Sequence, residues 1–332
     1  IEVGLDWRMF KQRFGLDLAF YNNIARNQIL DVPMDQTTGY TKATMNSGKV
    51  RNRGIELQLD GTPVKTKNFT WNSTFTWAKN YNKVLSLAAG LTDGQTIAYT
   101  GGTNCALIAK VGGSIGDIYG YKLKRAPDGQ VVWKDGITAR TTEFEYVGNA
   151  YPAWKAGFSN EFSYKNFRVS ILFDGQWGGI VYSQTHHKMT EHGTLKHTLK
   201  YRENPNFEVV GEGVMLDERG QYVPNNVPIS VSKYYADYWR RANVETNSFD
   251  ASFLKLREAR IEYTIPSAGL NKIGIERLTL ALYGRNLAMW TKDFPVYDPE
   301  VATLNNGTIV PGSEMGQLPS TRTMGFNLTL KF

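Results

Sequence analysis

All four histidines of the chain, His186, His187, His192 and His197, lie in one polar stretch. Imidazole is a common metal ligand, and a helical site would place two histidines four residues apart on one face. The spacing of five from His187 to His192 and on to His197 rotates successive side chains by about 140° around a helix, so they miss a common face. The pattern therefore favours a solvated polar loop over a metal site.

The other reactive side chains also lack the partners that catalysis needs. Cys105 is the single cysteine, which excludes an internal disulfide framework and a cysteine-based zinc site and leaves a plain thiol. Glu143 and Glu145 form a carboxylate pair of the kind that glycosidases use, but in a loop dense with charges such a pair is typical of solvated side chains. No serine elbow, catalytic-triad order or phosphate loop is present. We therefore predict no catalytic residue, no metal and no cofactor.

Aromatic side chains are the more informative group. Tyrosine and tryptophan rings stack on sugars and on peptide side chains, and they are equally suited to packing long loops against a partner protein. The densest cluster is Tyr-Tyr-Ala-Asp-Tyr-Trp at residues 234–239. The residues predicted to contact a substrate or a covering partner are Tyr119, Tyr121, Trp133, Tyr234, Tyr235, Tyr238, Trp239, Trp290 and Tyr297.

The closing stretch, residues 322–332, shows what kind of element carries these loops. Met324, Phe326, Leu328, Leu330 and Phe332 alternate with smaller or polar residues, which is the period of a β-strand with one apolar and one polar face. A strand between lipid and a watery lumen has this pattern, and so does a strand of a soluble β protein. Further strands must decide between the two.

The same alternation recurs eight more times. The predicted strands cover about 1–10, 13–22, 52–62, 69–79, 153–163, 167–181, 250–265, 277–287 and 320–332. Parity breaks between Phe253 and Leu256, so we expect a bulge or bend there. The predicted long loops cover about 23–51, 80–152, 182–249 and 288–319.

Short and long connections alternate along the chain, and this order is typical of outer-membrane barrels, which have short periplasmic turns and long outer loops. No run of eighteen apolar residues exists, so no transmembrane helix is predicted. The formal net charge of +7 is spread along the chain, so we read it as solvated loops and lumen and predict no nucleic-acid partner. The pattern predicts an all-β transmembrane antiparallel barrel, and a soluble repetitive β protein such as a propeller is the less favoured interpretation.

Four segments resemble the SusC/RagA family of TonB-dependent outer-membrane transporters. Residues 46–59 (NSGKVRNRGIELQL) resemble that family's N-x-G-x-x-x-N-x-G-x-E strand, and residues 250–266 (DASFLKLREARIEYTIP) resemble its D-A-S-F-x-[KR]-L-[RK] segment. Residues 284–300, which end in Asp-Pro-Glu, are similar to its N-L-x-x-x-T…D-P-E segment, and residues 319–332 are similar to its closing P-x-x-R-[TS] strand. The resemblance runs across nearly the whole chain.

The resemblance implies a 22-stranded plugged barrel of which residues 1–332 supply about nine C-terminal strands. It further implies energy coupling through TonB, a SusD-like surface lipoprotein as partner, a Bacteroidetes outer membrane, and import of oligosaccharides or peptides. The family's plug and TonB box are not found in this sequence. Nine strands leave two unpaired edges, which lipid does not tolerate, so we expect the remaining strands to come from another segment or chain.

Two other functions stay open at this point. A passive porin or a surface-binding barrel would show the same strands, and only a plug and TonB box would distinguish the importer from them. A surface hydrolase lacks a nucleophile constellation, so we predict that the protein is not an enzyme. The expected location is the outer membrane, with the C-terminus periplasmic and the long loops extracellular.

Overall fold

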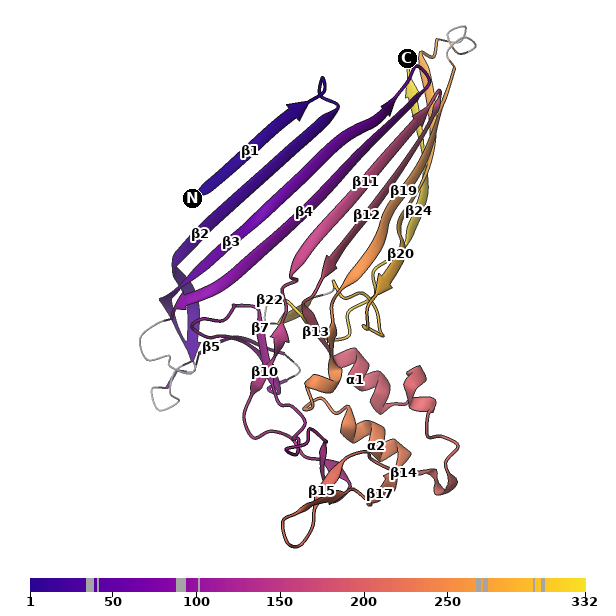
Figure 1. The fold of residues 1–332 in the computed structure, drawn as a ribbon. Helices are drawn as coiled ribbons and strands as arrows, with labels where there is room; N and C mark the ends of the chain where they lie inside the picture. The colour runs from indigo at the N-terminus through magenta and orange to yellow at the C-terminus, as the bar shows by residue number, and fades with distance from the viewer. Residues whose placement is uncertain are drawn as a thin grey trace.

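The computed structural model describes residues 1–332 except 34–38, 41, 88–93, 101, 267–269, 271–273, 301 and 306–307. Its main element is an open antiparallel sheet of nine strands, which we call the wall (Figure 1). The strands follow one another in the order β1 (Glu2–Met9), β2 (Phe14–Pro33), β3 (Lys42–Lys65), β4 (Phe69–Ser86), β11 (Trp154–Tyr164), β12 (Phe167–Trp177), β19 (Phe253–Ile265), β20 (Arg277–Thr291) and β24 (Thr323–Lys331).

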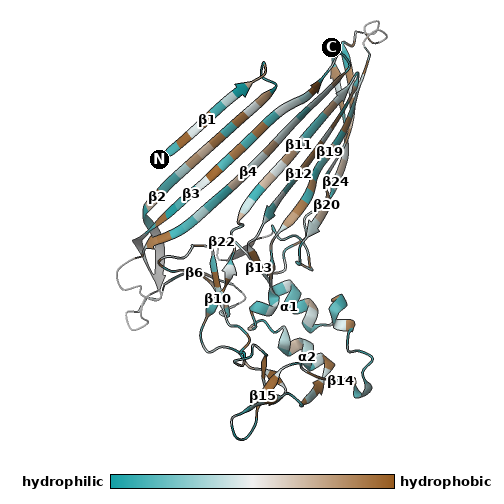
Figure 2. Cartoon of the chain, in the orientation of Figure 1, coloured by the Kyte–Doolittle hydropathy of each residue, from teal (hydrophilic) through white to brown (hydrophobic). Residues whose placement is uncertain are grey.

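The outward face of the wall is apolar and remains uncovered. Because successive side chains point to opposite faces, the register aligns Leu282 with Phe326 and Leu280 with Leu328 on one face. Leu282 is 64% exposed and Phe326 is 79% exposed. Figure 2 shows the resulting alternation of hydrophobic and hydrophilic positions along the strands. Large exposed apolar surface of this extent is typical of a face that contacts lipid.

The opposite face is polar and carries ion pairs between neighbouring strands. Arg8 reaches Asp17 at 2.9 Å, and Arg285 reaches Glu258 at 2.9 Å. A soluble sheet of this size would bury apolar side chains on at least one of its faces, whereas here the polar face is hollow and the apolar face is exposed. The fold class predicted from the sequence, a transmembrane antiparallel barrel wall, is confirmed in this arrangement.

Several wall strands are longer than the sequence pattern suggested. The predicted loop 23–51 is wrong at both ends, because β2 continues to Pro33 and β3 already begins at Lys42. Likewise β4 extends to Ser86 and β20 to Thr291, whereas β12 ends at Trp177. The extensions were missed because residues such as 22–28 and 46–53 are polar at most positions, so they carry no hydrophobic period although their backbones stay paired.

The predicted irregularity in β19 is confirmed as a β-bulge. Leu172 and Phe173 are consecutive in β12, but they face Glu258 and Leu256, so Arg257 is the extra residue. The inserted residue exchanges the faces of odd and even positions. Leu254 and Leu256 therefore point outward before the bulge, and Ile261 points outward after it.

The long connections fold into a compact body at one end of the wall, which we call the loop module (Figure 1). Its first part contains the strands β5 (Gln95–Thr100), β6 (Cys105–Ala109), β7 (Asp117–Gly120), β8 (Val132–Lys134), β9 (Ile137–Thr138) and β10 (Glu145–Asn149). Its second part contains β13 (Ile180–Ser183), α1 (Gln184–Glu191), η2 (Lys196–Leu199), η3 (Pro205–Phe207), β14 (Glu208–Val210), β15 (Val214–Leu216), β16 (Tyr222–Pro224), β17 (Pro228–Ser230), α2 (Val231–Tyr238), η4 (Glu245–Asn247) and β18 (Ser248–Asp250). The last connection adds β21 (Thr303–Asn305), β22 (Thr308–Val310) and β23 (Ser313–Glu314).

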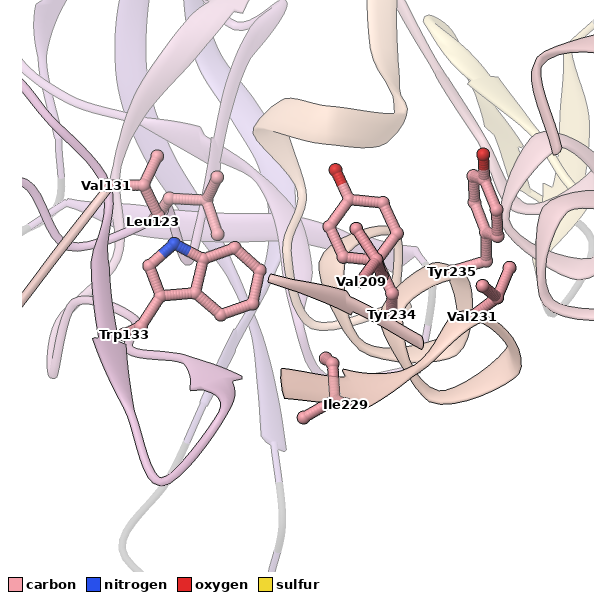
Figure 3. Close-up of a cluster of buried hydrophobic side chains, with 8 residues drawn as sticks. All are labelled: Leu123, Val131, Trp133, Val209, Ile229, Val231, Tyr234 and Tyr235. Atoms are coloured by element: carbon pink, nitrogen blue, oxygen red, sulfur yellow. The ribbon is translucent and has the colours of Figure 1, made fainter. Parts of the chain in front are cut away.

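The loop module has hydrophobic cores of its own. The largest joins β8 and its neighbours to α2 and β17, and Figure 3 shows its eight buried side chains. A second core surrounds Cys105, Ile118, Tyr182 and Val244. A third, around Val50 and Val84, fixes the module to the lumen side of β3 and β4. The segments predicted as loops therefore form a folded body.

The wall is not closed. Among the described residues, β1 and β24 stand at the two edges of the sheet and pair only with β2 and β20. No helix in the described part of the chain is long and apolar enough to span a membrane.

Candidate transport surface

The polar face of the wall contains a trough of about 770 Å³. Two rows of aligned positions form its floor. One row runs Gly4, Ala19, Glu56, Ala78, Lys155 and the next runs Asp6, Asp17, Gln58, Thr76, Gly157, Asp174. The small residues in these rows leave the space open. At Gly157 a Cβ atom would lie 2.8 Å from Thr76 Oγ1, so a larger residue there would displace its neighbour.

A second hollow of about 500 Å³ continues the trough towards the loop module and shares Glu56, Ala78 and Lys155 with it. Tyr21 lies across the floor here and donates a hydrogen bond to Asn80 Oδ1 at 3.1 Å. The ring occupies the position that a side chain at Gly54 would need, because a Cβ there would lie 2.6 Å from Tyr21 Cζ. This contact explains the need for glycine at that position of the Asn-Arg-Gly motif.

Amide side chains extend this hollow into the module. Asn52 Oδ1 accepts hydrogen bonds from Asn80 at 3.1 Å and from Asn82 at 2.9 Å. Asn82 in turn accepts from Ser114 Oγ at 3.0 Å. Amides and tyrosines side by side offer both hydrogen bonds and apolar ring faces, which suit a sugar or a peptide.

A buried ion network closes the trough at β19. Lys255, which is 2% exposed, donates to both carboxylate oxygens of Asp298 at 2.6 Å. Glu300 contacts Lys255 and also accepts from Arg257 at 2.6 Å. Arg257 is the bulged residue and binds Asp174 of β12 as well. The bulge thus directs a second cation to the segment that contains Asp298 and Glu300.

The charge of Asp298 depends on this network. Burial is the largest single influence and opposes ionisation of the carboxyl. The hydrogen bonds from Lys255, from the backbone of Glu300 and from Ser320, together with the charge of Lys255, outweigh burial and hold the pKa of Asp298 below its usual range. The backbone N–H of Glu300 also donates to Asp298 at 3.0 Å. The Asp-Pro-Glu segment is therefore held against the lumen side of the wall by charge-assisted hydrogen bonds.

The aromatic cluster predicted as the first contact surface lies in the module core. Trp133, Tyr234 and Tyr235 are buried (Figure 3). Tyr238 and Trp239 are half-buried and pack against this cluster. Trp133 stacks on Tyr234 at 6.1 Å, and its indole N–H donates to the carbonyl of Glu212 at 3.0 Å. The structure thus packs these five residues within the module, and their contact with a substrate or a covering partner stays a prediction.

The other four predicted contacts are dispersed. Tyr119 packs edge-on against Tyr146, and Tyr121 packs edge-on against Phe144. Trp290 is 53% exposed on the outward face of β20, opposite the lumen, where it lines an apolar groove of about 730 Å³ with Trp154, Trp177 and Leu254. Tyr297 is half-buried in the connection after β20.

The prediction of a solvated histidine loop is wrong for His186 and His187, whereas His192 is exposed. His186 and His187 are 3% and 4% exposed, and the ring of His186 stacks on that of His197 with centroids 5.3 Å apart. The helical-wheel argument failed because α1 ends at Glu191 and the chain turns back through η2. Within the described residues, no group of three or more ligating side chains is arranged to hold a metal ion.

Burial keeps these histidines neutral. Desolvation lowers the pKa of His186 to about 4, although a hydrogen bond to Asn247 at 2.9 Å opposes the shift. Desolvation lowers the pKa of His187 and of His197 as well. His187 bonds to the carbonyl of Trp239 at 2.8 Å. Neutral rings thus join α1 to α2 and η4.

Cys105 is also a core residue, because burial raises the pKa of its thiol and leaves it in the inert protonated form. Glu143 and Glu145 are exposed.

Sequence reasoning missed the floor of the trough itself. Tyr21, Glu56, Asn80, Tyr151 and Lys155 come from separate strands and from the edge of the module, and they meet through sheet pairing. The signal that could have found them was the inward parity of Tyr21, Glu56 and Lys155, combined with the small residues beside them.

The chain matches known proteins over its whole length. Residues 1–287 match the family model described as "TonB dependent receptor-like, beta-barrel". The TonB-dependent receptor P26 of Formosa agariphila is 29% identical over 362 aligned residues, which cover 100% of this chain and 34% of that receptor. The TonB-dependent receptor SusC of Bacteroides thetaiotaomicron is 25% identical over 194 residues, which cover 54% of this chain and 19% of SusC.

Solved structures show the same fold. The structure of the RagAB peptide transporter superposes with a TM-score of 0.69 at 20% identity, covering 100% of this chain and 35% of that chain. The present chain spans about a third of the length of the curated receptors that it matches throughout. Together with the bulged β19, the Asp-Pro-Glu segment and the lipid-facing wall, these matches show that the chain belongs to the TonB dependent receptor-like, beta-barrel family of outer-membrane proteins and is SusC/RagA-like.

Proposed function

We propose that this chain is part of an outer-membrane importer of oligosaccharides or peptides that is energised through TonB and works with a SusD-like surface lipoprotein. The observation that carries the proposal is the two-sided wall. Its outward face exposes apolar side chains, and its inward face holds a polar trough of about 770 Å³. A wall between lipid and a water-filled, polar inner face suits solute passage across the membrane.

The floor of the trough supports the proposed substrate class. Tyr21, Asn80 and Asn82 supply ring faces and amide hydrogen bonds, while Glu56 and Lys155 supply one charge of each sign. These groups accept a polar, uncharged or zwitterionic chain. One structural neighbour is a peptide transporter, and another relative is named SusC, which supports import as the role of this chain.

The proposed orientation places the short turns and the C-terminus in the periplasm and the loop module outside the cell. The module then stands where a lipoprotein partner could cover the trough. In this arrangement the network of Lys255, Asp298 and Glu300 holds the last long connection against the lumen side of β19.

Uptake measurements on the full-length protein in its own outer membrane test the proposal. Labelled oligosaccharides and oligopeptides are supplied to cells, and accumulation is followed before and after the proton-motive force is collapsed. We expect uptake of one of the two classes and its loss on collapse. Uptake that continues without the proton-motive force would identify a passive porin, and binding without accumulation would identify a surface-binding barrel.

The partner is tested separately. Affinity purification of the full-length protein from membranes in mild detergent should recover a surface lipoprotein in equal amount. Recovery of the barrel protein alone, while uptake remains energised, would contradict the SusD-like partner and leave the importer function in place.

A further inference from the structure

The outward face of the wall changes character at its module end. On β2, β3 and β4 this face is apolar over most of its height, and then six cationic side chains follow over a few residues. We call them the basic patch: Arg26, Lys49, Arg51, Arg53, Lys79 and Lys83.

Strand register makes the basic patch contiguous. Arg26 faces Lys49, and Arg51 faces Lys83, while Arg53 faces Tyr81. The next row towards the short turns is Phe20, Ile55 and Lys79. Below it the outward positions of these three strands are apolar, beginning with Leu18, Leu57 and Trp77, except at Gly61 and Ser73. The cations therefore form a band directly above the apolar surface.

The described part of the chain offers the basic patch no counter-charge. The carboxylates described on these strands, Asp17, Glu56 and Asp60, all point to the lumen. Among the described residues, no ion pair joins any of the six cations to an acid. Like charges that face each other across a sheet are destabilising, so an anion bound at the pairs Arg26–Lys49 and Arg51–Lys83 would relieve repulsion.

Two local features indicate what that anion must offer. The Nε atom of Arg51 is buried and has no hydrogen-bond partner among the described residues, so this guanidinium is not committed to a partner there. Tyr81, which is 52% exposed, lies under two cations, with Lys79 Nζ at 4.8 Å and Arg53 Cζ at 5.8 Å from its ring centre. The ring holds both cations at the boundary between the apolar and the charged surface.

We propose that the basic patch binds the phosphate groups of a phosphorylated lipid in the leaflet at the module end, with the acyl chains of that lipid against the apolar rows below. Charge and position support this occupant together. Arginine forks match phosphate oxygens, and the boundary of the apolar face is the level at which lipid head groups stand. The inference rests on the family's place in the outer membrane and is independent of import.

The full-length protein in nanodiscs is titrated with a phosphorylated diglucosamine lipid and with the same lipid after removal of its phosphates. The variant R51Q/K83Q removes two facing cations. Each cation near an anionic lipid surface strengthens binding, and the variant removes two of them. The expected loss of affinity for the phosphorylated lipid is therefore about 30-fold. The control K65Q/K67Q removes two exposed cations at the opposite end of the wall and should bind like the unmodified protein.

Three results would overturn the proposal. These are equal affinity of R51Q/K83Q and the unmodified protein, equal binding of the phosphate-free lipid, and displacement of the lipid by millimolar inorganic phosphate, which would indicate a site for free anions. Folding is monitored by heat-modifiable migration on gels. Should R51Q/K83Q fail to fold, the exposed pair K49Q/K83Q replaces it with the same expected and contradicting results.

Discussion

The wall and the loop module are stabilised in opposite ways. In the module, Trp133 and Tyr182 are almost completely removed from solvent, and apolar side chains meet across short strands and helices. In the wall, Leu282, Phe326 and Met324 are among the most exposed large apolar residues described, and the strands are joined by the backbone ladder and by ion pairs on the polar face. The module buries its apolar side chains against one another, as a water-soluble domain does. The apolar face of the wall is removed from water only when lipid covers it.

The difference has a practical meaning for substitutions. In the module, burial of a side chain indicates that substituting it will be destabilising. In the wall, a side chain that is exposed in the protein alone can be just as important, because lipid covers it in the membrane. Four experiments test or sharpen this contrast.

The largest effect is expected for Trp133→Ala in the module. The substitution empties the centre of the core, where the ring also fills the space beside Gly211, and should cost about 3–5 kcal/mol. Hydrogen exchange should show loss of protection in β8, β17 and α2, while heat-modifiable migration of the wall stays unchanged. Ile137→Ala, at a 38% exposed position nearby, is the control. Concerted loss of the wall would refute the separation of the two regions.

Leu282→Arg tests the wall. In a bilayer the outward cation should cost about 2–4 kcal/mol, although the residue is 64% exposed in the protein alone. Urea unfolding in lipid vesicles measures the difference. Thr329→Arg, on the lumen face of β24, should change stability little. An equally small effect at Leu282 would mean that this face does not contact lipid.

Acidification should weaken the module selectively. The pKa of His186 is about 4 in the folded state and ordinarily about 6.5, so the unfolded state binds more protons between these values, and stability falls as pH falls through this window. Between pH 7 and pH 5 the loss should be about 2 kcal/mol. Hydrogen exchange in α1 and α2 at both pH values measures it, and His186→Gln should reduce the dependence to the part contributed by His187 and His197, whose pKa values are also lowered. A dependence of unchanged size in this variant would assign it to groups other than His186.

The smallest effect is expected for Arg285→Gln. Its ion pair with Glu258 is 2.9 Å long, but the arginine side chain is 63% exposed, so removal should cost less than about 1 kcal/mol. Unfolding at low and high salt should show the unmodified protein approaching the variant as salt increases. A loss of several kcal/mol would mean that the lumen face excludes water around this pair.

The wall could be predicted from the sequence because each strand carries its own signal. The alternation of Met324, Phe326 and Leu328 reveals a strand and its faces without knowledge of any partner, and the parity break after Phe253 even located the bulge. Prediction failed where polar residues continued a strand, as in the upper part of β2 and β3, since pairing there leaves no hydrophobic period.

The module could not be predicted in the same way. Its main core unites Trp133 with Tyr234, and no local pattern relates residues so far apart in the chain. The aromatic cluster at 234–239 was found, but composition cannot distinguish a ring that is buried from one that is offered to a ligand. The histidine cluster failed for a related reason, because His197 meets His186 through a chain reversal.

The bulge at Arg257 has a consequence for how the sequence can change. Before the bulge the outward positions of β19 are even-numbered, and after it they are odd-numbered. The extra residue therefore keeps apolar side chains on the outward face in both halves of the strand. Deleting Arg257 alone would leave every residue type intact and yet turn either Leu254 and Leu256 or Ala259 and Ile261 towards the water-filled side. A single-residue deletion at this position should therefore be as harmful to the strand as many simultaneous substitutions, whereas deletions in the short turns would be absorbed locally.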